Sequence, residues 1–237
     1  MRCHCYETDS EFFFCVEDVE DAKLEDVIQH MAWKKSDGKF LMSYSQNAFS
    51  SQREKELISE NFSRFGQAMF ESSLLGFDWE KPLGMLAQKF NENGIEWYIV
   101  GSVGDALRGV DIKPFDIDIV VHTRDFCRAK ELCYYHFPDS VIIWPFTDNE
   151  KTNPLRYFGR LFLAGALIEV AADETWNLDS RQQGFGGFTS PISQYEKASW
   201  NGHDVYLESL RLRYQIEKAR NRKDRVKALK KHLKRTK

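Results

Sequence analysis

Two carboxylates lie close together in a short apolar segment near the middle of the chain. Residues 115–121 alternate between apolar side chains and the acids Asp116 and Asp118, which predicts a strand. Side chains two positions apart on a strand share a face, so the two acids are expected roughly 6 to 7 Å apart along it. Like charges in such a setting repel each other and lose solvation. A divalent cation is the natural partner, because Mg²⁺ binds one or two carboxylates together with substrate phosphates.

The segment just upstream predicts a place for those phosphates. Residues 97–100 form an apolar run that ends at Gly101 and Ser102, and residues with good helix propensity follow. A strand that turns into a helix presents unpaired backbone N–H groups and the positive end of the helix dipole to an anion. A phosphate site and a metal site are therefore expected within one short span. Taken singly, Gly-Ser is an ordinary turn and Asp-x-Asp an ordinary solvated strand face.

This arrangement resembles the nucleotidyltransferase superfamily, which includes DNA polymerase beta-like, CCA-adding and antibiotic-modifying enzymes. The family pattern is an apolar residue with Gly-Gly or Gly-Ser, then a spacer of nine to thirteen residues, then two acids separated by one apolar residue. Here Val100, Gly101 and Ser102 are followed by thirteen residues and then by Asp116 and Asp118. A third acid on a later strand completes the pattern, and Glu169, between Ile168 and Val170, fits it. The resemblance covers about residues 77 to 210.

The resemblance implies an enzyme that moves a nucleoside monophosphate from an NTP, such as ATP, to an acceptor hydroxyl and releases pyrophosphate. It implies Asp116, Asp118 and Glu169 as the catalytic residues and as ligands of Mg²⁺, with two ions expected. Glu169 either completes the metal site or takes the acceptor proton. Gly101 and Ser102 would hold the terminal phosphates, and Arg108 and Lys113 would add contacts to them. For Arg108, an ion pair with Asp105 or Asp111 is the alternative.

The acceptor is predicted less directly. A small hydroxyl-bearing molecule, such as an antibiotic, is the first expectation, because no large helical tRNA-binding body follows residue 210. The alternatives are toxin-like transfer to tRNA or protein, and a non-catalytic scaffold that binds nucleotides. The stretch from 218 to 237 supports an RNA partner, because it contains eleven Lys or Arg and a single acid, Asp224. A solvated helix face is the simpler interpretation of that stretch.

The composition of the chain is that of a globular protein rather than of a membrane-spanning or disulfide-rich one. The chain has 237 residues, 42% of them hydrophobic and 29% charged, with a net charge of −3, all ordinary for a globular protein. No apolar run has membrane-spanning length, so no membrane partner is expected. Five cysteines and the lack of a hydrophobic leader favour a reduced, cytoplasmic protein.

We predict an α+β fold with a nucleotidyltransferase-type mixed sheet flanked by helices. Residues 77–210 would form this domain, with hairpins turning at 164–165 and 201–202. Residues 1–76 would form a small α+β accessory module of βαβα type, with a role in packing, homodimer formation or lining the substrate site. Residues 211–237 would form a basic helical segment. Residues 177–195, rich in Gly, Ser, Gln and Phe, would form a loop, either near the substrate or as a plain surface loop.

Overall fold

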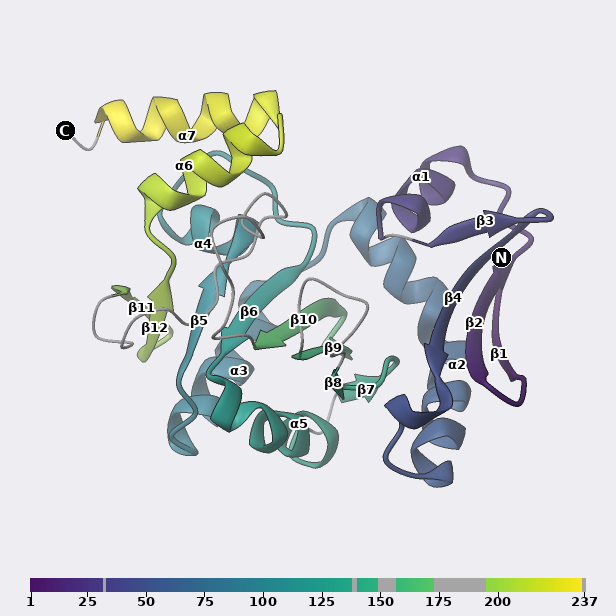
Figure 1. The fold of residues 1–237 in the computed structure, drawn as a ribbon. Coiled ribbons are helices and arrows are strands. Elements are labelled where there is room, and N and C mark those ends of the chain that lie inside the picture. Colours follow the sequence, from purple (N-terminus) through teal and green to yellow (C-terminus); the bar gives the residue numbers. More distant parts are fainter. Residues whose placement is uncertain (32, 138–139, 149–156, 173–194, 236–237) are drawn as a thin grey trace.

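The computed structural model describes residues 1–31, 33–137, 140–148, 157–172 and 195–235. Two sheets, flanked by helices, lie at opposite sides of the molecule in Figure 1, so the predicted α+β class is confirmed. The predicted loop at 177–195 lies outside the described residues, apart from Tyr195. None of the helices in these ranges combines the length and the apolar character needed to cross a membrane.

The first sheet is antiparallel and has four strands in the order β1-β2-β4-β3. Its elements are β1 (Arg2–Glu7), β2 (Glu11–Glu17), α1 (Ala22–His30), β3 (Lys34–Ser36), β4 (Lys39–Ser45) and α2 (Gln52–Leu75). In the sequence, Ser50 or Ser51 as a cap and the apolar spacing that follows predict a helix from Gln52 to about Leu75, and α2 has these bounds. Ser51 caps it by accepting a bond from the Glu54 N–H at 3.1 Å. The predicted βαβα pattern is wrong, because it omits β1 and β3. Strand β3 is Lys-Lys-Ser and has no apolar residue, and β1 alternates only through Cys3 and Cys5, without the aliphatic residues typical of a strand.

The second sheet has eight strands and carries the predicted carboxylates. Its elements, with the helices between them, are α3 (Glu80–Glu92), β5 (Trp97–Val100), α4 (Gly101–Leu107), β6 (Ile117–Val121), α5 (Phe126–Tyr135), β7 (Ser140–Ile142), β8 (Thr147–Asp148), β9 (Tyr157–Leu163), β10 (Ala166–Ala172), β11 (Glu196–Trp200) and β12 (His203–Leu207). The order is β11-β12-β5-β6-β10-β9-β7, with β8 also paired to β9. Strand β6 is parallel to β10 and antiparallel to β5, so the sheet is mixed as predicted. Both predicted hairpins, β9–β10 and β11–β12, are confirmed.

Two helices complete the chain where the sequence predicted one basic segment. They are α6 (Leu210–Ala219) and α7 (Lys223–Arg235), and Asn221 turns the chain between them with a φ of 55°. The Ser209 hydroxyl caps α6 by accepting a bond from the Leu212 N–H at 3.2 Å. In Figure 1, α6 and α7 lie beside α4, far from the first sheet.

A shared hydrophobic core joins the first sheet to the second. The indole ring of Trp144, which follows β7, lies 5.8 Å from the Phe14 ring and 5.9 Å from the Phe62 ring. The Asn61 side chain on α2 donates a hydrogen bond of 2.9 Å to the carbonyl of Ile142. Helix α2 therefore packs against both sheets. The division at residues 76 and 210 stays a prediction.

Candidate active site

The carboxylate site is built on one row of residues that crosses four neighbouring strands. Val100 on β5 pairs with Asp118 on β6, Asp118 pairs with Glu169 on β10, and Glu169 pairs with Arg160 on β9. Residues in register on adjacent strands place their side chains on the same face of a sheet. The predicted proximity of Asp118 and Glu169, which are far apart in the sequence, is therefore confirmed by the strand register.

Three carboxylates converge on this face. Asp116, Asp118 and Glu169 each offer one oxygen atom, these atoms all lie within 4.8 Å of one another, and all three residues are half-buried. Strand β6 begins at Ile117, so Asp116 lies in the bend before the strand rather than on it. The predicted strand over 115–121 is thus too long at its start, and the bend turns Asp116 toward the other two acids.

Burial and mutual repulsion destabilise the charged forms of the two aspartates in this cluster. Burial, reinforced by the charge of Glu169, raises the pKa of Asp116 to about 6. Burial, together with the charges of Asp116 and Glu169, raises the pKa of Asp118 well above its usual range. Three convergent carboxylates supply the oxygen ligands that Mg²⁺ prefers, and a divalent cation would offset their repulsion. The residues present therefore fit such an ion.

Gly101 lies directly against the carboxylate of Asp118. It connects β5 to α4 with a φ of 72°, a conformation that glycine adopts far more readily than other residues. A β-carbon at this position would overlap the Oδ2 atom of Asp118. Ser102 follows in the first turn of α4 and is 2% exposed. The predicted phosphate turn and the predicted metal site are therefore adjacent in the structure.

Arg160 is a member of the site that the sequence prediction missed. Its Nε atom donates a hydrogen bond of 2.6 Å to Oε1 of Glu169. Its guanidinium lies 5.3 Å from the centre of the Trp144 ring and 5.0 Å from that of Phe158. A signal for Arg160 existed, because a hairpin that turns at Ala164 and Gly165 places residue 160 opposite residue 169.

The first sheet reaches the same region through Tyr44 on β4. Burial raises the pKa of Tyr44, the charge of Arg160 opposes this, and the charge of Glu169 reinforces it. The Tyr44 ring also packs against Phe14, with a centroid separation of 5.7 Å. Tyr44 therefore lies within electrostatic range of the Arg160–Glu169 pair.

The two predicted basic phosphate ligands make contacts elsewhere. Arg108 forms an ion pair of 2.8 Å with Glu196 and donates a bond of 3.1 Å to the carbonyl of Gly104. Its ion-pair partner is therefore neither Asp105 nor Asp111, which the sequence had offered as alternatives. Lys113 donates a bond of 3.2 Å to the carbonyl of Leu75, at the end of α2. The roles of Arg108 and Lys113 toward a nucleotide stay predictions.

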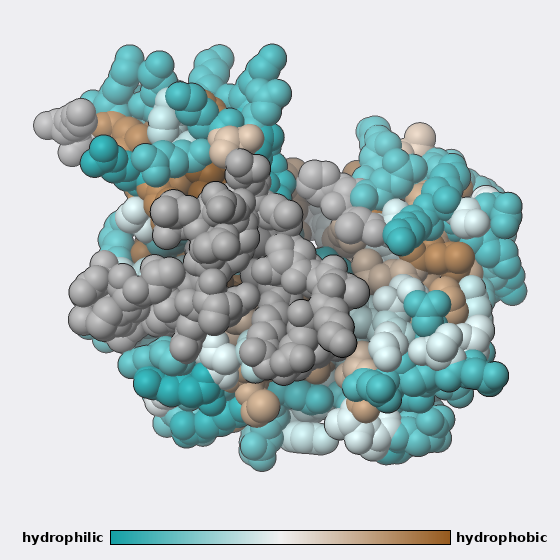
Figure 2. Space-filling view, in the orientation of Figure 1, coloured by the Kyte–Doolittle hydropathy of each residue, from teal (hydrophilic) through white to brown (hydrophobic). Residues whose placement is uncertain are grey.

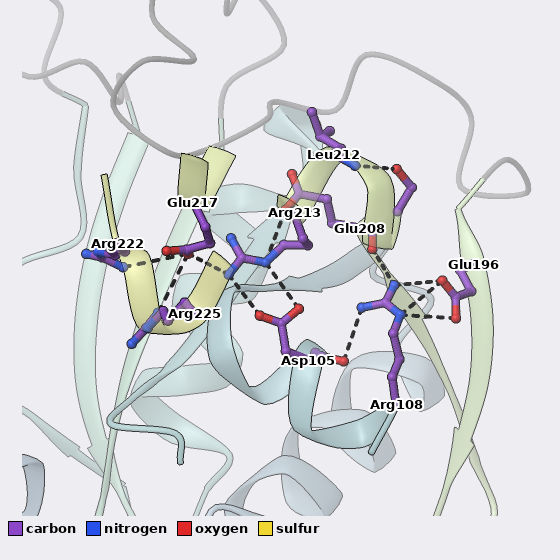
Figure 3. A network of polar contacts seen from close by, with 11 residues as sticks. Asp105, Arg108, Glu196, Glu208, Leu212, Arg213, Glu217, Arg222 and Arg225 are labelled. Carbon is purple, nitrogen blue, oxygen red and sulfur yellow. Dashed lines mark hydrogen bonds and ion pairs between the residues drawn. The ribbon is translucent and has the colours of Figure 1, made fainter. Parts of the chain in front are cut away.

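A buried ionic network ties α4 to α6 and α7 (Figure 3). Arg213 on α6 is 2% exposed, and its Nη2 atom lies 3.0 Å from Asp105 on α4 and 2.8 Å from Glu217. Arg222 and Arg225 each approach the same Glu217 oxygen to 3.7 Å. The helix that follows the glycine turn is thus fixed to the basic end of the chain.

Among the residues of this network, Glu208 has the fewest partners for its carboxylate oxygens. It is 2% exposed, and neither of its carboxylate oxygens has a hydrogen-bond partner among the residues that the structure describes. Its carboxylate lies 3.9 Å from the Nε atom of Arg213, while Arg108 donates a hydrogen bond to its backbone carbonyl. Burial raises the pKa of Glu208 to about 7, although the charge of Arg213 opposes the shift.

The network also brings positive charge to the carboxylate site. Arg225 and Arg222 both act electrostatically on Asp116, and each lowers its pKa against the larger effect of burial. The guanidinium of Arg225 lies 5.9 Å from the centre of the Phe115 ring, beside Asp116. The start of α7 is therefore a neighbour of the site, which the sequence did not reveal.

Among the solved structures that are similar to this chain, two are nucleotidyltransferase-like by their descriptions. One is a candidate nucleotidyltransferase from Thermotoga maritima, with 19% identity over 65% of this chain and 92% of that chain, and a TM-score of 0.42. The other is an antigenic nucleotidyltransferase-like protein from Paracoccidioides brasiliensis, with 16% identity over 63% of this chain and 74% of that chain, and a TM-score of 0.40. No family model and no curated protein matches the sequence.

Proposed function

We propose that this protein is a nucleotidyltransferase that moves a nucleoside monophosphate from an NTP to an acceptor hydroxyl. The observation that carries the proposal is the convergence of Asp116, Asp118 and Glu169 beside the turn at Gly101. Phosphoryl-group transfer depends on positioning and charge neutralisation more than on covalent help from the protein. A cluster of metal-binding acids next to a backbone anion site meets both requirements.

In this proposal the three carboxylates and the turn at Gly101 have separate tasks. Asp116, Asp118 and Glu169 would hold Mg²⁺, with two ions expected, and this metal would supply the charge neutralisation that transfer of a phosphoryl group needs. Gly101 lets the backbone pass close to Asp118, so that the N–H groups at the start of α4 can face the terminal phosphates.

We assign Glu169 to metal binding rather than to proton abstraction. Its Oε1 atom already accepts the hydrogen bond from Arg160, so this oxygen is engaged. Its other carboxylate oxygen stays available as a ligand for a metal. Among the sequence-based alternatives, a ligand role suits a polymeric acceptor and a base role suits a small one.

The alternatives within the proposal differ in the molecule that accepts the NMP group. A small molecule such as an antibiotic was the first expectation from the sequence, and tRNA or protein the second. The position of the basic helix α7 beside Asp116 and Phe115 favours a polyanionic acceptor. A non-catalytic scaffold would bind NTP and Mg²⁺ without releasing pyrophosphate.

Pyrophosphate release tests the proposal directly. The purified protein is incubated with Mg²⁺ and each NTP, together with pools of small hydroxyl compounds, antibiotics and total RNA. We expect release with one NTP and one acceptor class, and its loss in the Asp116→Asn/Asp118→Asn double variant. The Asp9→Asn/Asp26→Asn double variant removes two exposed acids outside the second sheet, one between β1 and β2 and one on α1, and should keep full activity. NTP binding without pyrophosphate release from any pool would favour the scaffold, and absence of NTP binding would overturn the proposal.

A further inference from the structure

We propose that α7 and Phe115 bind the 3′ end of a single-stranded RNA and present its terminal hydroxyl to the carboxylate site. This inference rests on the proposed function and narrows its acceptor to one class. It is carried by four properties of the molecule: the charge of α7, the burial of its apolar side, its position, and the cleft beside it.

Helix α7 presents positive charge that the described residues do not neutralise. Between Lys223 and Arg235 it contains seven Lys or Arg and one acid, Asp224. Its exposed cations are Lys223, Lys227, Lys230, Lys231, Lys234 and Arg235, and none of them forms an ion pair within the described parts of the chain. Hydrophilic side chains project from the outer side of α7 in Figure 2. A row of unpaired cations along one helix is the electrostatic footprint of a polyanion site.

The apolar side of α7 is already in use within the fold. Leu229 is fully buried, and Val226 and Leu233 are half-buried. An interfacial membrane helix must instead keep such a face free for insertion among lipids. The free surface of α7 is therefore polar and basic, which suits phosphate groups rather than a bilayer.

The position of α7 links this charge to the carboxylate site. Arg225, in its first turn, acts electrostatically on Asp116 and lies over the ring of Phe115. Phe115 is 46% exposed although it is a large hydrophobic residue. Exposed aromatic rings beside cations stack unpaired bases, which is how proteins commonly hold single strands. A strand along α7 with its last base on Phe115 would bring its terminal ribose beside Asp116.

A cleft of about 360 Å³ runs between α7 and the loop after α4. Its charged lining consists of the cations Lys227, Lys231 and Arg235 and the acids Asp111 and Asp224. The cations outnumber the two acids, so the cleft offers a path for a phosphate backbone. A single strand satisfies all four properties, because it combines regular negative charge, stackable bases and a terminal hydroxyl.

Salt-dependent RNA binding tests the inference on the full chain. Fluorescence anisotropy would measure the affinity for a labelled single-stranded RNA at increasing KCl, with the Lys227→Gln/Lys231→Gln/Arg235→Gln variant beside wild type. We expect the negative slope of log K against log salt to be shallower in the triple variant by about 2, because each of the three lost phosphate contacts accounts for about 0.7 of its magnitude. Substitution of Phe115 by Leu should weaken binding about tenfold with little change in slope, since stacking does not release counterions.

A charge-matched control separates specific contacts from net charge. Lys23, Lys34 and Arg53 are exposed residues of the N-terminal part of the molecule, and their substitution by Gln also removes three positive charges. This control should bind RNA as wild type does. An equal loss of affinity in both triple variants would overturn the role of α7, and equal binding of the same sequence as DNA would overturn the assignment to RNA.

A transfer assay distinguishes the failure of this inference from that of the proposed function. The protein should transfer the labelled NMP group of an NTP to an RNA with a free 3′ hydroxyl, with release of pyrophosphate. It should not transfer this group to an RNA with a 3′ phosphate. Pyrophosphate release with a small acceptor, without labelling of RNA, would overturn the RNA inference and leave the nucleotidyltransferase proposal standing. RNA binding without pyrophosphate release under any condition would overturn the nucleotidyltransferase proposal itself.

Discussion

The contact between Gly101 and Asp118 makes one substitution especially informative. Replacing Gly101 by Ala adds a β-carbon that would overlap Oδ2 of Asp118, and it forces alanine to adopt a φ of 72°. The backbone strain costs about 1 to 2 kcal/mol, and the overlap adds about 1 to 3 kcal/mol of overpacking. We therefore expect the free energy of unfolding to fall by about 3 kcal/mol.

Position 94 provides a matched control for the strain. Gly94 has a φ of 63°, and a β-carbon there would meet no atom within 4 Å. The Gly94→Ala variant should lose only the strain energy, about 1 to 2 kcal/mol, and keep its activity. The difference between the two variants isolates the cost of pushing against Asp118.

The effect of Gly101→Ala on Asp118 can be measured both as a loss of stability and as a loss of turnover. A loss of about 3 kcal/mol corresponds to a fall in Tm of roughly 6 to 12 °C for a chain of this size. A displacement of Asp118 by about 1 Å should lower the rate of pyrophosphate release about 100-fold. Equal loss of stability in the two variants, together with full activity of Gly101→Ala, would refute the packing of Gly101 against Asp118.

Three further predictions concern charged groups. In wild type, Glu208 keeps its proton in the folded protein up to about pH 7, whereas the unfolded chain loses it at about pH 4.5. The free energy of unfolding of wild type therefore falls by about 3 kcal/mol as pH rises through that window. Glu208→Gln should remove this part of the pH dependence. Arg160→Met should destabilise the protein by about 3 to 5 kcal/mol and lower turnover, because Glu169 would lose the partner of its nearly buried ion pair. Mg²⁺ at about 100 times its Kd should stabilise wild type by about 2.7 kcal/mol, and the Asp116→Asn/Asp118→Asn variant far less.

Each of these predictions has a clear contrary result. Urea unfolding at pH 5 and pH 8 measures the first, and the same pH dependence in Glu208→Gln and wild type would contradict it. An Arg160→Met variant as stable and as active as wild type would show that the Glu169 pair is dispensable. Equal stabilisation of wild type and the double variant by Mg²⁺ would place the metal elsewhere.

The sequence by itself determined the local parts of the fold and of the site. The bounds of α2, the two hairpins and the turn from β5 into α4 depend on capping, turn residues and hydrophobic periodicity, which act over a few positions. The alternation of acids with apolar residues at 116–119 likewise revealed the first two carboxylates.

Tertiary structure alone decided which distant residues meet. Glu169 reaches Asp118 because β10 pairs in parallel with β6, and Arg108 pairs with a glutamate 88 positions away. Strands β1 and β3 are strands because their neighbours in the sheet satisfy their backbone groups, although their own residues carry little strand signal. The folding of α7 back beside Asp116 depends on the buried contacts of Arg213 and Glu217, and burial follows from the packing of the whole chain rather than from any local pattern.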